Sequence, residues 1–133
     1  MVERSLVFIK PDGVQRKLVG RIIARFEDKG FNLEQLSLVN MSSDLVDKHY
    51  IEHVEKPFFP NLKKYIMSGP IIVMVLEGEG VITHIRKMVG ATNPIEAEQG
   101  TIRADYALNT SFNIIHASDS TESAEREIKN FFG

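Results

Sequence analysis

Short apolar runs along the chain predict four strands. Residues 6–9 form an apolar run that stops at the turn-forming residues 11–13, which predicts a buried strand ended by a turn. Residues 70–77 hold six consecutive apolar residues, which is typical of a central strand covered on both faces. Residues 31–39 predict a less buried strand interrupted by polar positions, and residues 113–116 predict a short final strand.

Apolar residues spaced three to four apart predict the helices between these strands. In residues 19–29 they fall on one face, and Gly30 follows as a C-terminal cap. A polar loop is expected at residues 91–100, around Pro94. The other helices are expected after a cap at Ser42 or Ser43, over residues 61–67, after the turn at Gly78 and Gly80, and from Ser120 to Phe132.

The order of these elements predicts the fold class. Without the extra short helices it is β-α-β-β-α-β, the ferredoxin-like arrangement of a four-stranded antiparallel sheet with helices packed on one face. The chain has 133 residues and shows no internal repeat, linker or low-complexity segment. We therefore expect a single α+β domain over residues 1–133.

Composition and charge exclude several functional classes. The formal net charge is −2, which gives no electrostatic reason to expect nucleic-acid binding. The chain has no cysteine, which excludes disulfides, thiol catalysis and zinc–thiolate sites. Its first residues lack a signal-peptide pattern, and its longest apolar run is too short to cross a bilayer. We expect a cytoplasmic protein with no membrane partner.

The common phosphate-binding motifs are absent from the sequence. The P-loop fails because no Gly-Lys pair occurs, and G-x-G-x-x-G begins at Gly78 but has Thr83 in place of its third glycine. The H-R-D and D-F-G motifs of protein kinases are missing as well. Any phosphoryl chemistry therefore needs a different arrangement of residues.

One metal motif offers an alternative function. His49, Glu52 and His53 match H-x-x-E-H, the pattern of inverted zinc proteases, and on a helix both histidines would share one face. A catalytic zinc needs a third protein ligand, and no downstream residue is marked as one. The inner face of the same helix also needs His49 for packing. A zinc hydrolase therefore remains an alternative.

A richer set of candidates consists of scattered cations and one histidine. Lys10 ends a predicted buried strand, Arg86 borders the packed face of a helix, and Arg103 follows the polar loop. Each alone is more typical of a solvated charge, but together they could neutralise most of a triphosphate. His116 ends the last strand and is followed by small residues that leave space beside its ring. A neutral imidazole is a competent nucleophile toward phosphorus.

With these residues placed, the chain resembles the nucleoside diphosphate kinase family over nearly its whole length. The family's active-site pattern, Asn-x-x-His-[Gly/Ala]-Ser-Asp, is met at residues 113–119, and a Lys-Pro-Asp-Gly motif begins about a hundred residues upstream, at Lys10. Ala117 fills the small position after the histidine. Further matching segments are residues 48–50, 56–60, 68–70, 92–94 and 100–103.

The resemblance implies a ping-pong transfer of a phosphoryl group from a nucleoside triphosphate to a nucleoside diphosphate. It implies that His116 is the nucleophile, with Ser118 and Glu127 supporting it. It also implies a Mg²⁺ ion that is held through the nucleotide phosphates and by no protein side chain. The implied ligands of the phosphates are Lys10, Tyr50, Arg86, Thr92 and Arg103; Asn113 and Lys10 reach the ribose, and Phe58 stacks on the base beside Leu62.

Helical spacing gives independent support for Glu127. Ala124, Ile128 and Phe131 form the apolar stripe of the last helix, and Glu127 borders it. A carboxylate there is costly unless it is hydrogen-bonded, so we expect it to accept the second N–H of His116. Arg126 falls with the other charges of this helix on the side expected to face solvent.

Two departures from the family pattern, and one competing class, bear on these expectations. Thr110 stands where the family often has an apolar residue against the base, so we expect a shifted nucleotide affinity in this chain. The resemblance implies a hexamer; because the chain ends at Gly133, without the tail that longer members use in subunit contacts, a tetramer is the second possibility. A non-catalytic ferredoxin-like module that binds nucleotide or protein is the competing class.

Overall fold

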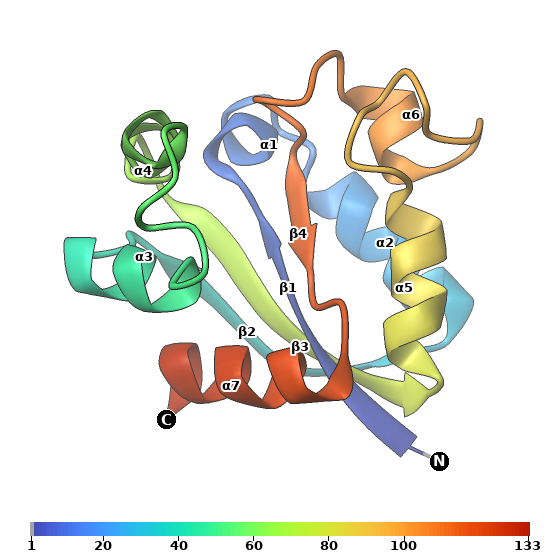
Figure 1. Cartoon of the computed structure of the whole chain (residues 1–133). Coiled ribbons are helices and arrows are strands. Elements are labelled where there is room, and N and C mark those ends of the chain that lie inside the picture. The colour runs from blue at the N-terminus through green and yellow to red at the C-terminus, as the bar shows by residue number, and fades with distance from the viewer. Residues whose placement is uncertain (1) are drawn as a thin grey trace.

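The computed structural model describes residues 2–133 (Figure 1). Its main elements follow the predicted β-α-β-β-α-β order, with additional helices between them. In chain order the elements are β1 Val2–Ile9, α1 Pro11–Gln15, α2 Val19–Lys29, β2 Asn32–Val39, α3 Ser43–His49, α4 Phe59–Ile66, β3 Ile71–Glu79, α5 Val81–Val89, α6 Ile102–Tyr106, β4 Ile115–Ala117 and α7 Thr121–Phe132.

The four strands form one antiparallel sheet in the order β2-β3-β1-β4. The long strands β1 and β3 lie in the centre, as their apolar runs predict, and β2 lies at one edge. Alternate residues of β2 stay exposed, which agrees with the prediction of a less buried strand, although two of the exposed residues are the apolar Leu36 and Leu38. The ferredoxin-like α+β fold is confirmed.

Helices cover both faces of the sheet, so the expectation of one covered face is wrong in this respect. Val7 and Ile9 pack with α2 and α5, whereas Leu6 and Phe8 point the other way and pack with α3, α4 and α7. Figure 1 shows the two groups of helices on opposite sides of the strands. Central strands that are apolar on both faces leave two surfaces to bury, and the extra helices bury the second.

The short helices account for the remaining differences from the prediction. The turn after β1 is a five-residue helix, α1, with Pro11 at its start, where a missing N–H costs nothing. Helix α4 begins at Phe59, two residues before the start predicted at residue 61, and α6 was not predicted. The predicted caps of the longer helices are present: Ser42 Oγ accepts from Leu45 N, and Ser120 Oγ accepts from Ser123 N.

Within residues 2–133, no helix combines the length and apolar character that spanning a membrane requires.

Candidate active site

His116 lies in the middle of β4, directly opposite Phe8 of β1. The Phe8 ring stacks on the imidazole with centroids 4.9 Å apart and planes 24° apart. His49, at the end of α3, meets the same imidazole edge-on at 4.6 Å and 82°. Two rings from separate elements therefore fix the plane of the His116 side chain.

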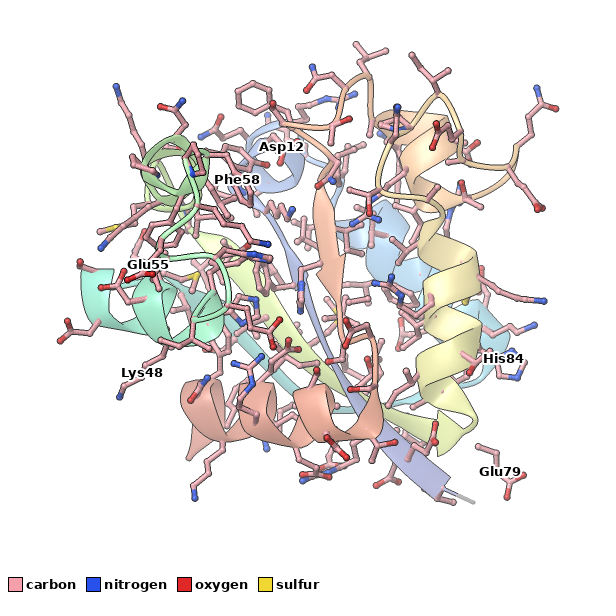
Figure 2. All side chains as sticks on the ribbon, in the orientation of Figure 1. Asp12, Lys48, Glu55, Phe58, Glu79 and His84 are labelled. Atoms are coloured by element: carbon pink, nitrogen blue, oxygen red, sulfur yellow. The ribbon has the colours of Figure 1, made fainter. Side chains whose placement is uncertain are left out.

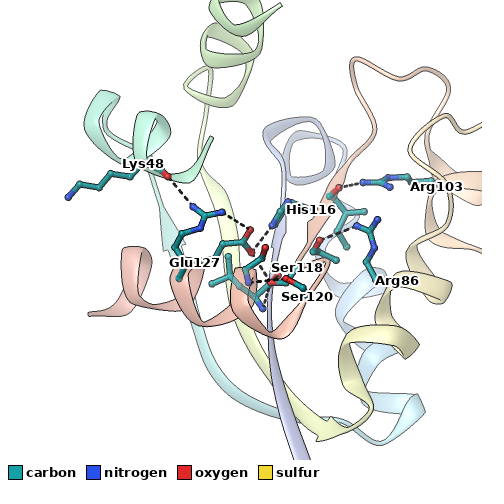
Figure 3. Close-up of polar contacts among 12 residues, drawn as sticks. Lys48, Arg86, Arg103, His116, Ser118, Ser120 and Glu127 are labelled. Carbon is teal, nitrogen blue, oxygen red and sulfur yellow. Dashed lines mark hydrogen bonds and ion pairs between the residues drawn. The ribbon is translucent and has the colours of Figure 1, made fainter. Parts of the chain in front are cut away.

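The third constraint on His116 comes from α7 (Figure 3). Its Nε2 lies 3.0 Å from Oε1 of Glu127, which is only 4% exposed. An ionised carboxylate can only accept a hydrogen bond, so this contact places the imidazole proton on Nε2 and leaves the Nδ1 lone pair free. The imidazole is thereby held in the tautomer that can act as a nucleophile through Nδ1.

Ser118 holds the carboxylate of Glu127 in turn. Its Oγ lies 2.7 Å from Glu127 Oε1 and accepts from Leu6 N at 3.0 Å. Ser118 N also donates to Leu6 O, which extends the pairing of β1 with the chain beyond β4. The hydroxyl is fully buried, so its position is set by the sheet.

The zinc motif does not form the predicted site. Helix α3 ends at His49, so His53 lies in the turns that follow and the two histidines do not share a continuous helix face. Within residues 2–133, the metal-capable group whose ligand atoms lie within 4.8 Å of one another is His49, His116 and Glu127, without Glu52 or His53. His49 is buried, and burial, followed by the charge of His116, lowers its pKa to about 2.

A cleft with two adjoining lobes opens beside His116. The first, here called the polar lobe, has a volume of about 300 Å³ and is lined by His116, Glu127 and most of the candidate cations. The second, here called the aromatic lobe, has a volume of about 660 Å³. Both lobes are lined by the same five residues at their junction: Lys10, Tyr50, His53, Thr92 and Asn113.

Lys10 follows β1 immediately and stands at the junction of the lobes. Its Nζ donates to Asn113 Oδ1 at 2.7 Å. Burial, followed by the charge of Arg103, lowers the pKa of Lys10 to about 7, while the charge of Asp12 opposes the shift. Asp12 itself accepts a hydrogen bond from Tyr65 Oη. The ammonium group therefore lacks a carboxylate hydrogen-bond partner among residues 2–133.

Arg103 is almost fully buried, contrary to the behaviour typical of a single arginine. Its guanidinium donates to the carbonyl oxygens of Gly90 at 3.0 Å, Ile115 at 2.7 Å and Asn113 at 3.4 Å. Burial, and then the charge of Arg86, lowers the pKa of Arg103 to about 10. It therefore enters the polar lobe as a fixed positive charge.

Two further groups point to an anionic ligand in the polar lobe. Arg86 extends from α5, and its guanidinium donates to Ala117 O at 3.3 Å. The buried Tyr50 Oη has no hydrogen-bond partner within the described chain. Burial raises the pKa of Tyr50, so the hydroxyl keeps its proton and can donate it to an anion. A phosphate oxygen would satisfy such a donor.

The aromatic lobe is formed by residues around α4 and the loop before β4. Phe58 caps α4 and exposes half of its surface, and Leu62 lies one turn further along the helix. Figure 2 shows Phe58 at the same end of the molecule as Asp12 of α1. Thr110 and the half-exposed Phe112 line the lobe from the loop.

All but one of the residues proposed from the sequence line this cleft. The exception is Ser118, which lies beneath Glu127. Sequence reasoning named His53 only as part of the zinc motif, and it missed Tyr65, Phe112 and Arg126. Arg126 was expected to face solvent, but it lines the polar lobe, and its guanidinium donates to Lys48 O at 3.2 Å. The apolar stripe of α7 could not predict this position of Arg126, because the cleft there is closed by another helix, α3.

Comparison with known proteins agrees with this geometry. Residues 3–133 match the family model described as nucleoside diphosphate kinase. A nucleoside diphosphate kinase of Methanothermobacter thermautotrophicus is 60% identical over 98% of this chain and 87% of its own length. That of Thermus thermophilus is 55% identical over 98% of this chain and 96% of its own.

Solved structures show the same likeness. The apo nucleoside diphosphate kinase of Encephalitozoon cuniculi superposes with a TM-score of 0.96 at 43% identity, covering 98% of this chain and 89% of that one. The Aquifex aeolicus enzyme superposes with a TM-score of 0.96 at 38% identity, covering 100% and 96%. With the family model matching almost from end to end, this chain belongs to the nucleoside diphosphate kinase family.

Proposed function

We propose that His116 carries the phosphoryl group between a nucleoside triphosphate and a nucleoside diphosphate. The observation that carries this proposal is the continuity of the cleft, in which an oriented imidazole and several cations adjoin an aromatic lobe large enough for a base. The phosphates occupy the polar lobe, and the base occupies the aromatic lobe. The competing class, a non-catalytic binding module, gives no reason for the ordered contacts around His116.

In the first half-reaction, the Nδ1 lone pair of His116 forms a bond to the γ-phosphorus. The bond from that phosphorus to the β,γ-bridging oxygen breaks, and the nucleoside diphosphate leaves with the electron pair. Glu127 accepts the Nε2–H throughout and stabilises the positive charge that develops on the ring. In the second half-reaction, a terminal oxygen of another diphosphate attacks the phosphorus, and His116 is restored.

The cations orient the phosphates and neutralise their charge. Lys10, Arg86 and Arg103 supply positive charge, and Tyr50 and Thr92 add hydroxyl donors beside them. Asn113 and Lys10 reach the ribose at the junction of the lobes. Phosphoryl transfer leaves a protein little covalent chemistry beyond the nucleophile, so positioning and charge dominate.

Mg²⁺ fits this cleft as a partner of the nucleotide. The group His49, His116 and Glu127 is rich in nitrogen, whereas Mg²⁺ prefers oxygen ligands. The polar lobe also carries the positive charges of Lys10, Arg86 and Arg103, which favour phosphate oxygens over a free cation. The ion would therefore be held by the phosphate oxygens and not by protein side chains. When bound, it supplies additional positive charge to the phosphates.

The aromatic lobe supports broad base specificity. Phe58 offers an exposed ring face with Leu62 beside it, and every base has a π-face that can stack on such a ring. Thr110 lines the same lobe as a small polar residue in place of an apolar wall.

We further propose that this single domain, residues 1–133, forms a homo-oligomer, with a hexamer as the expected form and a tetramer as the second. We also propose a cytoplasmic location. Edge strand β2 exposes Leu36 and Leu38, two large apolar side chains beside unpaired backbone groups. In the loop at 91–100, Ile95 is 86% exposed. Apolar surface of this kind is typical of subunit contacts.

Brief exposure to γ-labelled ATP tests the proposed mechanism. We expect an acid-labile, alkali-stable label that GDP removes, which is the behaviour of phosphohistidine. His116→Ala should fold normally and lose labelling and transfer by on the order of 10³-fold or more. An acid-stable label, or near-normal turnover of His116→Ala, would exclude the mechanism, and nucleotide binding without any label would favour the binding module.

A further inference from the structure

The residue between Asn113 and Ile115 has an unusual backbone conformation. Ile114 has a φ of +76°, and only it and Lys17 combine a positive φ with a side chain within residues 2–133. Ile115 N donates to Asn113 O at 2.8 Å, which closes a three-residue turn around Ile114. A γ-turn with positive φ is rare and strained, and a β-branched residue at positive φ is a true outlier.

Contacts on two sides hold this turn in place. The Ile114 side chain is fully buried and belongs to the core beneath α2 and α5. A Cβ on Gly13 would come within 3.0 Å of Ile114 Cγ2, so α1 leaves room for the turn only because it has glycine there. The Ile114 carbonyl accepts a 2.6 Å hydrogen bond from Lys10 N. Packing on one side and a backbone bond on the other offset the strain.

The turn presents Asn113 to three other parts of the cleft. Asn113 Oδ1 accepts from Lys10 Nζ, its Nδ2 donates to Thr92 O at 3.3 Å, and its backbone oxygen lies 3.4 Å from Arg103 Nε. Strained backbone held by its surroundings is a recurrent feature of functional sites. The chain reverses at this point, so a relaxed turn would swing Asn113 away from these partners.

We propose that Ile114 is a positioning residue, whose buried side chain forces the backbone into a strained turn that holds Asn113 between Lys10, Thr92 and Arg103. This inference rests on the proposed role of Asn113 and Lys10 in binding the nucleotide. It predicts that Ile114 acts on the ligand only through Asn113. It also predicts that the native turn needs either the isoleucine anchor or a residue without a Cβ.

The substitutions Ile114→Ala and Ile114→Gly separate anchoring from strain. Both remove the buried anchor, but alanine still resists a positive φ whereas glycine adopts it freely. Asn113→Ala alone, and both Ile114 substitutions in the Asn113→Ala background, complete the set. Calorimetry measures the affinity for MgADP, and thermal unfolding checks that each variant is folded.

We expect Ile114→Ala to weaken MgADP binding by roughly tenfold, because the competent turn becomes a minor conformation. Ile114→Gly should bind several-fold more tightly than Ile114→Ala, and this difference should vanish in the Asn113→Ala background. Equal affinities for the two, or tighter binding by Ile114→Ala, would overturn the inference. If Asn113→Ala binds MgADP with wild-type affinity, Asn113 does not make the proposed nucleotide contact. Labelling of His116 tests the mechanism separately.

A milder pair keeps the inference testable if a truncation prevents folding. Ile114→Val and Ile115→Val each trim one methyl group from neighbouring buried residues. The inference requires weaker MgADP binding for Ile114→Val than for Ile115→Val. The reverse order would contradict it.

Discussion

Replacing Glu127 with glutamine removes one negative charge from beneath His116 but keeps an oxygen that can accept its Nε2–H. The side chain is 4% exposed and lies 2.7 Å from Ser118 Oγ, so glutamine can occupy the same volume with the same neighbours. What changes is the stabilisation of the ring when it becomes positively charged during transfer. Glu127→Gln therefore isolates the electrostatic part of this contact.

The expected size follows from the strength of the hydrogen bond. A bond to a charged group contributes about 1.5–3 kcal/mol and one between neutral groups about 0.5–1.5 kcal/mol. The loss of about 1–1.5 kcal/mol corresponds to roughly tenfold in rate. Glu127→Ala also frees the ring and its tautomer. The effect of removing the hydrogen-bond partners of metal-bound histidines suggests a loss approaching roughly a hundredfold.

Rapid-quench measurement of phosphohistidine formation from ATP gives the rate of the first half-reaction directly. Glu125→Gln is a matched control on the same helix, because Glu125 is exposed and binds Arg4 at 3.0 Å, away from the cleft. We expect the control to react at the wild-type rate, and MgADP affinity to change little in all variants. Glu127→Gln and Glu127→Ala rates within twofold of wild type would refute the role assigned to Glu127.

Three further outcomes are expected. ATP should phosphorylate GDP, CDP, UDP and TDP with kcat/KM values within roughly a hundredfold of one another, because stacking on Phe58 is tolerant of the base; strict use of one base in coupled assays would contradict this. Lys10→Met should abolish transfer, yet at pH 6.5 it should resist urea better than wild type. The pKa of Lys10 in the folded protein, about 7, lies below its ordinary 10.5, so the wild type gains stability as pH rises between those values. The difference in unfolding free energy between Lys10→Met and the wild type should therefore narrow by pH 9.5; a constant difference would refute the reasoning. Light scattering should give a hexamer or, failing that, a tetramer, and Leu38→Lys on the exposed edge should weaken it; a wild-type monomer or plain dimer would exclude the proposed assembly.

The strands and long helices could be predicted because their signals are local. Residues 6–9 and 70–77 are continuous apolar runs, and they became the central strands β1 and β3. Their two apolar faces already required cover on both sides, so the expectation of one covered face contradicted its own premise. Helix α6 has only five residues, too few for a hydrophobic period, and its sole local signal is the cap that Thr101 provides to Ala104 N.

The site was predictable as a set of residues but not as a network. Spacing within α7 placed Glu127 at the edge of a buried stripe, and the contact with His116 Nε2 follows from a helix that folds back beside β1. The bond from Lys10 to Asn113 joins residues 103 positions apart, and no local pattern encodes it. Ile114 looks like an ordinary strand residue in the sequence, and no local pattern signals its positive φ.

Burying the charged Lys10 side chain in the cleft lowers the stability of the fold. Each unit of pKa shift represents 1.36 kcal/mol, so a fall from 10.5 to about 7 sets an upper limit of about 5 kcal/mol for keeping the ammonium charged beside Arg103. Bound phosphates would supply the negative charge that Asp12 alone does not, and would raise the pKa of Lys10 again. Nucleotide binding near neutral pH would therefore draw a proton onto this amine. The desolvation of Lys10 that destabilises the folded protein thus strengthens its attraction for a polyphosphate. A neutral methionine at this position would lose both effects together.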